Sequence, residues 1–372
     1  MAGGLAELGW DRAAASSLGV QRMGDWYGSG PVLAAERRLL FSKSWALVAS
    51  SEEVAQPGSY VTATLGNAPV AVVRGSDGEL RAFHNICRHR GMTLLEGSGR
   101  LGRFITCPYH QWSFALDGPL VQVPQSDTQF DGIELKRWGL LPVAVSEWRG
   151  MVFANPDPDA PSLVEAMAGL DGRLASFLSG PLRQVACTHY DAECNWKLLI
   201  ENHVDVYHLW YLHSRSLNGY AHRSFEWAPY GDNWWSMEPL RDPTAAPAGL
   251  PWLTERERHS IGAHLLFPNL MMVTTGEYFA TYDAVPVTPS RTRLTLRVRA
   301  QEGADADRLV AAIRTFLSED LEACRRLQLA ASSEAFDYGP MASLHEAPVR
   351  RFHASLRRAL LPADQPRCRE PA

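Results

Sequence analysis

The sequence predicts an α+β protein, with a small all-β region followed by a larger region of mixed strands and helices. Short apolar runs of β type fill residues 59–153, separated by turns that contain Gly, Asn and Asp. Apolar residues recur at helical spacing in residues 305–328. Before that helix, Leu294, Leu296 and Val298 alternate with polar residues, as in a strand with one buried face.

The composition is that of a soluble globular protein, with 46% hydrophobic and 21% charged residues among 372. A net charge of −5 gives no reason to expect nucleic acid or another polyanion as a partner. No apolar run approaches the roughly 18 residues of a membrane span. Residues 1–10 lack the basic and apolar segments of a secretory signal.

Six cysteines are too few and too scattered for a disulfide scaffold. They are Cys87, Cys107, Cys187, Cys194, Cys324 and Cys368. We therefore expect a cytoplasmic protein whose thiols stay reduced and free to bind metal.

The elements are expected in three parts: residues 1–42, a β domain at 43–156, and residues 157–372. A helix at 34–47 leads into the β domain, and the Pro- and Asp-rich residues 155–159 end it. Beyond residue 156, the patterns predict helices at 162–178, 195–212, 305–328 and 350–361, and strands at 185–194, 265–287 and 291–298.

The β domain contains two Cys/His pairs in the pattern C-x-H-x17-C-x-x-H, formed by Cys87, His89, Cys107 and His110. Two thiolates and two imidazoles on two loops make a complete four-ligand site. Each loop supplies one sulfur and one nitrogen, which favours a [2Fe–2S] cluster of the Rieske type over other sites. A single zinc ion in tetrahedral S2N2 geometry is the alternative.

A second pattern between these loops, G-x-G-x-x-G at residues 97–102, matches the dinucleotide-binding fingerprint. It does not follow a strand and open a helix, so the fingerprint lacks its structural context. We interpret it as a turn.

A second metal site is predicted from His208, His213 and Asp320. Two imidazoles and one carboxylate form a face that binds Fe(II) and leaves coordination positions open. On a regular helix, five steps of about 100° leave two side chains about 140° apart. We therefore expect a π-type bulge or a helix end between His208 and His213.

Other polar residues near these positions receive different roles. Asp205 precedes His208 by three residues and can orient its imidazole or connect the two metal sites through a hydrogen bond to a cluster histidine. His203 is expected to be a core or surface histidine. Glu319 and Glu322 are expected to be solvated on the other faces of their helix.

These motifs resemble the α (large) subunit of Rieske non-haem iron aromatic-ring-hydroxylating oxygenases, over nearly the whole chain. The resemblance includes the flanks of the Cys/His motif, Arg90-Gly91 and Gln111-Trp112. It also includes Asn195-Trp196-Lys197, Glu201-Asn202, Asp205, Tyr207-His208, His213, Phe267-Pro268-Asn269 and the helix from Glu319-Asp320 to Gln328.

The resemblance implies a Rieske domain inserted into a helix-grip catalytic domain, in which an antiparallel sheet holds helices. It implies a homotrimer in which the cluster of one subunit serves the iron of its neighbour, with Asp205 bridging His208 to His110 or His89 across the interface. The implied function is that of a terminal oxygenase component. It would activate O2 and hydroxylate, dioxygenate or oxidatively demethylate a small organic substrate.

Electrons have to come from a separate NAD(P)H-dependent reductase, with or without a ferredoxin, because the chain has no credible nucleotide-binding or ferredoxin motif.

A substrate pocket is expected between the helix with the two histidines and the sheet. Its candidate lining residues are Leu209, Trp210, Leu217, Phe267, Asn269, Leu270 and Met272. The flanking motifs resemble α subunits that hydroxylate or demethylate, including those acting on quaternary ammonium compounds. An aromatic cage for a cation is conceivable from Trp210, Trp227, Tyr230, Trp234 and Trp235, whereas simple packing of these rings is the alternative.

Two other functions remain open. A Rieske electron carrier would hold the cluster alone, but a domain of roughly a hundred residues suffices for that, and His208 and His213 would be idle. A zinc-binding structural protein would be colourless.

Overall fold

The computed structural model describes residues 16, 18, 20–245 and 249–361. Residues 1–10 and Cys368, which entered the predictions above, lie outside the described residues. The chain divides into two compact units. One is formed by residues 37–166, and the other by the residues before 37 together with those after 166. The predicted domain limits at 43 and 156 both lie inside the first of these units.

The unit of residues 37–166 is built almost entirely from antiparallel strands. A seven-stranded sheet has the order β1-β10-β9-β4-β3-β2-β5, and a three-stranded sheet has the order β6-β7-β8. The strands are β1 (Ala46–Ser50), β2 (Ser59–Leu65), β3 (Ala68–Arg74), β4 (Leu80–His84), β5 (Ser98–Arg100), β6 (Phe104–Thr106), β7 (Ser113–Ala115), β8 (Leu120–Gln122), β9 (Pro142–Trp148) and β10 (Met151–Asn155). The short helices are η1 (Phe41–Lys43), η2 (Ser51–Val54), α5 (Ser126–Gln129) and η3 (Leu135–Trp138).

The turn between β2 and β3 illustrates how the sequence folds here. Gly66 adopts φ +62°, a left-handed conformation that side chains disfavour. A Cβ at this position would lie 2.4 Å from the carbonyl oxygen of Arg37, so the close approach of backbone also requires glycine. The residues on either side pair in register, with Leu65 opposite Ala68.

The predicted helix at 34–47 is correct only in its first part. Helix α4 (Gly30–Leu39) is followed by η1, and the chain then enters β1 at Ala46. Ala46 pairs with Ala154 of β10, and the indole nitrogen of Trp45 donates to the carbonyl oxygen of Pro161. These contacts with residues more than a hundred positions away override the local helical pattern.

The larger unit contains a second seven-stranded antiparallel sheet, in the order β11-β17-β16-β15-β14-β13-β12. Its strands are β11 (Leu182–Ala192), β12 (Glu226–Tyr230), β13 (Asn233–Pro239), β14 (Ser260–Leu266), β15 (Leu270–Thr274), β16 (Tyr278–Thr288) and β17 (Arg291–Gln301). The helices of this unit are α3 (Asp25–Gly28), α7 (Leu170–Leu174), α8 (Trp196–Val204), η4 (Tyr207–Trp210), η5 (His222–Ser224), η6 (Pro243–Ala245), α9 (Glu255–Arg258), α10 (Ala306–Ala331) and α11 (Ala347–Leu360), while α4 and α6 (Leu163–Met167) each cross a limit between the two units.

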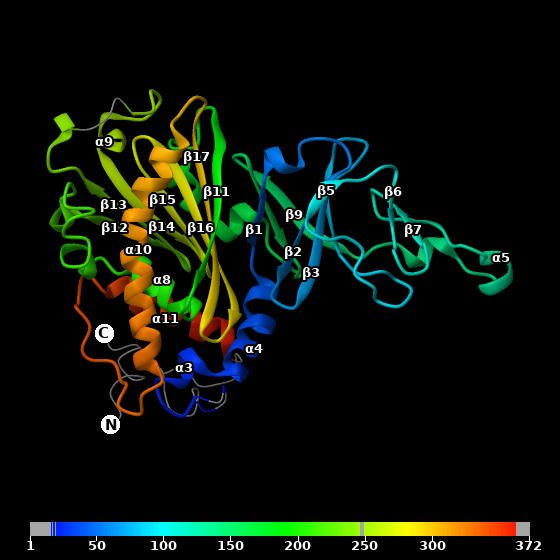
Figure 1. The fold of residues 1–372 in the computed structure, drawn as a ribbon, viewed down its shortest axis with the longest axis horizontal. Helices are drawn as coiled ribbons and strands as arrows, with labels where there is room; N and C mark the ends of the chain where they lie inside the picture. The colour runs from blue at the N-terminus through cyan, green and yellow to red at the C-terminus, as the bar shows by residue number, and fades with distance from the viewer. Residues whose placement is uncertain (1–15, 17, 19, 246–248, 362–372) are drawn as a thin grey trace. The chain divides into compact units, whose positions relative to one another are not determined.

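Helices α8 and α10 pack against each other and against this sheet (Figure 1). In α10, Leu309, Ile313, Leu317 and Cys324 are buried at helical spacing and form the inner stripe. The larger unit combines an antiparallel sheet with helices that pack on it, and its residues come from both sides of the β unit in the sequence. These features confirm the predicted α+β class and the inserted β domain. No helix in the described ranges combines the length and apolarity needed to cross a membrane.

Candidate metal centres

The two Cys/His loops have the same backbone conformation. In the first, the amide of Cys87 donates to the carbonyl of Met92, and the amide of Gly91 donates back to Cys87. In the second, Cys107 bonds in the same way to Trp112, and Gln111 donates back to Cys107. The fourth residue after each cysteine has a positive φ, +76° for Gly91 and +59° for Gln111.

The equivalence requires Gln111 to adopt a conformation that is costly for a residue with a side chain. Such strain persists where the surrounding structure enforces it. Two loops held in matching conformations present one thiol and one imidazole each, so the two cysteines could hold one iron and the two histidines the other.

The side chains of these loops fit a [2Fe–2S] cluster. The rings of His89 and His110 lie 4.7 Å apart between centroids, and Nδ1 of His89 is buried without a hydrogen-bond partner in the ranges that the structure describes. Cys87 and Cys107 are buried and carry free thiols. Burial and the neighbouring Cys107 thiol raise the pKa of Cys87, whose proton a metal would displace.

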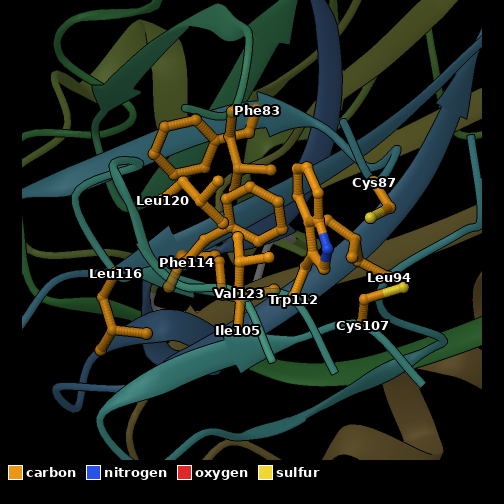
Figure 2. Close-up of a cluster of buried hydrophobic side chains, with 12 residues drawn as sticks. Phe83, Cys87, Leu94, Ile105, Cys107, Trp112, Phe114, Leu116, Leu120 and Val123 are labelled. Atoms are coloured by element: carbon orange, nitrogen blue, oxygen red, sulfur yellow. The ribbon is translucent and has the colours of Figure 1, made fainter. Parts of the chain in front are cut away.

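The cysteines belong to a buried hydrophobic cluster that supports both loops, and Figure 2 shows them at the same edge of it. The ring of Trp112 stacks on that of His89 with centroids 4.8 Å apart. An apolar wall behind the ligands restricts solvent access, which is one of the factors that sets the potential of such a cluster.

The second centre brings together His208, His213 and Asp320. One ligand atom from each residue lies within 4.8 Å of the others. Nε2 of His213 is 2.9 Å and Nε2 of His208 is 3.6 Å from the same oxygen, Oδ1 of Asp320. Two nitrogens and one oxygen converging from one side fit a metal ion with open positions on the other side.

The path of the chain explains how two histidines five residues apart reach one site. Helix α8 was expected to continue to residue 212, but it ends at Val204, and the amide of Val206 bonds to the carbonyl of His345. His208 then lies in the short helix η4, which ends before His213. A helix end between the two histidines was predicted; the α-helix itself stops earlier, because Asp205 is already in an extended conformation.

Three polar residues that sequence reasoning did not assign hold these side chains. Oε2 of Glu319 lies 2.7 Å from Nδ1 of His213 and also accepts a hydrogen bond from Ser216. Asn202 donates to Oδ1 of Asp320 over 2.8 Å. The expectation that Glu319 is solvated was wrong, because successive helical residues are only about 100° apart and the adjacent Glu319 and Asp320 both contact His213. That adjacency was the signal available in the sequence.

The site is electrostatically coupled. Burial lowers the pKa of His208, but Asp205 and Asp320 more than offset this and raise it to about 9. Burial acts to raise the pKa of Asp320, but its contacts with His208 and His213 outweigh this and hold it well below its usual range. Oδ2 of Asp205 lies 3.5 Å from Nδ1 of His208.

His203 and Glu322 were not expected to bind metal, and the structure shows the surroundings of both. His203 is not part of the three-residue group; its Nε2 lies 3.0 Å from the carbonyl oxygen of His264, and burial lowers its pKa to about 4. Glu322 lies at the surface, where Arg325 and Arg326 pair with it.

A cavity of about 80 Å³ lies beside the second centre, lined by all three of its residues. Of the seven predicted lining residues, Leu209 and Leu217 border it. The other five do not: Trp210, Phe267, Asn269, Leu270 and Met272. On β15 the inward position belongs to Val273, because side chains alternate along a strand.

The predicted cage rings are dispersed. Trp234 lines the cavity, whereas Trp210 packs on His345, and Trp235 contacts Arg173. In the described residues, the five rings therefore do not form one cage around this cavity.

Comparison with known proteins agrees with the two sites. Residues 44–142 match the Rieske [2Fe-2S] domain, and residues 180–361 match the catalytic domain of the ring hydroxylating alpha subunit. The chain belongs to the family of Rieske oxygenase α subunits. The cofactors that go with these two domains are a [2Fe–2S] cluster and a mononuclear iron.

Curated relatives include both monooxygenases and dioxygenases. The carnitine monooxygenase oxygenase subunit of Acinetobacter baumannii is 34% identical over 212 residues, which is 56% of this chain and 54% of that protein. Biphenyl 2,3-dioxygenase subunit alpha of Rhodococcus jostii is 35% identical over 46% of this chain and 39% of its own length. The chain spans about half the length of the carnitine and glycine betaine monooxygenase subunits that it matches.

The fold is shared with a solved quaternary ammonium Rieske monooxygenase. Its structure with L-carnitine has a TM-score of 0.77 and covers 91% of this chain and 95% of its own. Its structure with γ-butyrobetaine has a TM-score of 0.75, with coverage of 91% and 94%. Sequence identity is 24% in both, so this likeness is one of fold.

Proposed function

We propose that this chain is the terminal oxygenase component of a Rieske system. Cys87, His89, Cys107 and His110 would hold the cluster, and His208, His213 and Asp320 the mononuclear iron. The observation that carries the proposal is the presence in one chain of two donor sets of different chemistry, the second beside a cavity. When bound, the two groups supply stored electrons and a site for activating O2.

The residues around the iron site would keep its ligands in place. Glu319 holds Nδ1 of His213, so that Nε2 points toward Asp320. Asn202 occupies one lone pair of Asp320 and restricts rotation of the carboxylate. The largely apolar lining of the cavity, with Leu209, Leu217 and Val273, would admit a small organic substrate and limit water.

Asp205 would link the two kinds of site in a homotrimer. Its Oδ1 accepts from the amide of Tyr207 over 2.6 Å, which fixes the side chain, and its Oδ2 lies near His208. In the proposed assembly, a lone pair of this carboxylate that is still free accepts a hydrogen bond from His110 or His89 of a neighbouring copy. A separate NAD(P)H-dependent reductase, with or without a ferredoxin, would supply the electrons.

Hydroxylation or oxidative demethylation of a small organic molecule is the reaction proposed. Quaternary ammonium compounds are the first substrates to assay, since carnitine and glycine betaine monooxygenases are among the relatives. The dispersed cage rings mean that a cation would have to be recognised by Trp234 and the acidic residues of the cavity rather than by the five-ring cage.

Metal analysis and activity together test this function. An oxygenase should contain iron and sulfide in a ratio of about three to two and show the brown colour of a Rieske cluster. An electron carrier with the cluster alone would contain equal amounts of iron and sulfide, and a zinc protein would contain neither iron nor sulfide. His213→Ala should retain the colour and lose substrate-stimulated oxygen uptake with a surrogate reductase. His189→Ala, at an exposed strand residue of the same unit, should retain both.

Retained turnover in His213→Ala would contradict the iron assignment. Purified protein that binds only zinc would contradict the whole proposal.

A further inference from the structure

A buried acid–histidine pair outside the proposed iron ligands also lines the cavity. It is formed by His222, the first residue of η5, and Glu238 of β13. Nδ1 of His222 lies 2.5 Å from Oε2 of Glu238, and the side chains are only 2% and 7% exposed. A carboxylate this close keeps a proton on Nδ1 and fixes the orientation of the ring.

The other nitrogen of this ring is unsatisfied. Nε2 of His222 is buried and has no hydrogen-bond partner among the residues that the structure describes. A buried polar atom without a partner loses its hydration and gains nothing in return, so native proteins rarely keep one without a reason. Two other polar side chains on the cavity wall are already engaged, with Ser236 bonded to Ala263, and Asn202 to Asp320.

The wall around this pair has further capacity for hydrogen bonding. Trp234, Ser236 and Glu238 alternate along β13 and share one face of the strand. The indole nitrogen of Trp234 is another buried atom without a partner in the described part of the chain. Burial and the nearby Glu277 and Glu238 raise the pKa of Tyr220, which also lines the cavity, to about 12, so its hydroxyl remains a donor.

We propose that the His222–Glu238 pair binds a hydroxyl group of the substrate. A hydroxyl both donates and accepts, so it can pair with Nε2 whether the imidazole is neutral or protonated. A trimethylammonium group offers no hydrogen bond to Nε2, and the facing carboxylate is already occupied. The inference rests on the proposed function, because it takes the cavity beside His208, His213 and Asp320 as the substrate cavity.

The test is anaerobic titration calorimetry of the holoenzyme with matched probes. L-carnitine and γ-butyrobetaine differ by one hydroxyl, and so do benzyl alcohol and toluene. In at least one pair, the wild type should bind the hydroxyl-bearing member at least about tenfold more tightly. In His222→Phe the preference should fall to within about twofold, and His222→Gln should restore part of it, because an amide still hydrogen-bonds.

A matched control exists in the same unit. His353 is also buried and paired with a glutamate, with Nε2 2.9 Å from Oε1 of Glu201. Its Nδ1 likewise has no hydrogen-bond partner among the described residues. Unlike His222, however, His353 does not line the cavity. His353→Phe should alter thermal stability and leave the hydroxyl preference at the wild-type value.

Three results would overturn the proposal. The wild type could show no preference for the hydroxyl-bearing probe, or no binding, in both pairs. His222→Phe could keep the wild-type affinity ratio, or His353→Phe could lose the preference as fully as His222→Phe. Binding is measured without O2 or reductant. A protein that loses its preference in His222→Phe but has no mononuclear iron would therefore refute the oxygenase function while supporting this binding site.

Discussion

Glu319 and Asp320 are adjacent on α10, yet they contact opposite nitrogens of the same imidazole. Asp320 faces Nε2 of His213, and Glu319 faces Nδ1. Because Glu319 accepts from Nδ1–H, it selects the tautomer whose Nε2 lone pair is free for a metal. The two acids therefore act on one ring in different ways, one as proposed ligand and the other as orienting group.

Removing the orienting carboxylate should weaken metal binding without removing a ligand. For Glu319→Ala, we expect the mononuclear site to lose about 10- to 100-fold in metal affinity, with partial recovery in Glu319→Gln. Competition with a chelator measures this directly. Glu322→Gln, at the surface of the same helix, is the control and should bind metal like the wild type. Unchanged affinity in Glu319→Ala would show that the contact does not orient His213.

The pKa of His208 makes metal binding pH-dependent. In the metal-free protein this pKa is raised to about 9, above the ordinary value of about 6.5, so the protonated ring stabilises the fold below pH 6.5. That contribution is lost as the pH rises through 9. A metal needs the neutral ring, so affinity should rise with pH over the same interval.

Calorimetry in buffers of different ionisation enthalpy tests this linkage. Cobalt(II) binding to metal-depleted protein at pH 7.5 should release about one proton per ion, from His208. Asp320, whose pKa is lowered, contributes none. His203→Gln should leave the proton count unchanged, because burial keeps the pKa of His203 near 4. Release of almost no proton would show that His208 is neutral before metal binds.

Among the elements, α8 is the one whose position matters most for the site, and its start is held by Asn195. The side chain of Asn195 accepts from the amide of Lys197 as an N-cap. The side-chain nitrogen Nδ2 of Asn195 also donates to the carbonyls of Tyr27 and Pro289. The residue is buried, so these three bonds tie the helix start to two distant segments.

Asn195→Ala should therefore cost more than an ordinary cap. We expect a loss of about 2–4 kcal/mol in the free energy of unfolding, from the cap itself and from the Pro289 carbonyl, which loses its donor, whereas the Tyr27 carbonyl keeps a bond from Gln328. The matched variant is Asp305→Ala, which removes the exposed N-cap of α10 and should cost about 1 kcal/mol. Urea unfolding of both measures the difference. Equal losses would mean that the contacts to Tyr27 and Pro289 contribute little.

Element boundaries show what local patterns can predict. The strand β17 and the helix α10 were expected close to where they occur, because their period-two and helical patterns persist over many residues. The predicted strand region 265–287 contains β15 and most of β16, but only the last two residues of β14. The ends of α4 and α8 were misjudged. Each is decided by a contact with a distant segment, β10 for the chain after α4 and His345 for the chain after α8.

On the scale of the whole molecule, a buried ion pair joins the N-terminal segment to the helix that leads to the iron site. Nζ of Lys197 lies 2.5 Å from Oε1 of Glu36, and both side chains are fully buried. Oε2 of Glu36 accepts from the indole of Trp196. Burial lowers the pKa of Lys197, but the ion pair with Glu36 acts to raise it.

Lys197→Met should leave Glu36 buried without a counter-charge and destabilise the protein by about 3–5 kcal/mol. The double variant Lys197→Met with Glu36→Gln should recover part of the loss, since no net charge then remains buried. Chemical unfolding followed by tryptophan fluorescence measures both. Arg183→Met, which breaks an exposed pair with Glu302, should change stability little. If Lys197→Met alone were as stable as the double variant, the unpaired charge of Glu36 would be ruled out as the cause of the lost stability.

By itself, the sequence determined the α+β class and the chemistry of both metal centres. Strand and helix periods, turn residues and the spacing of Cys and His act over short stretches of chain, so they can be interpreted without knowledge of the fold. The choice of His208 and His213 was also made at that level, whereas the choice of Asp320 relied in part on the family resemblance. The structure places the three within 4.8 Å, and their role as ligands stays a prediction.

Only the tertiary structure decided which side chains support the iron site and which line the cavity. Glu319, Asn202 and the His222–Glu238 pair were not expected, and five of the seven predicted lining residues face elsewhere. A single step along a strand reverses the direction of a side chain, and a turn that ends a helix redirects all that follows. These directions are settled by long-range packing, which a local pattern does not contain.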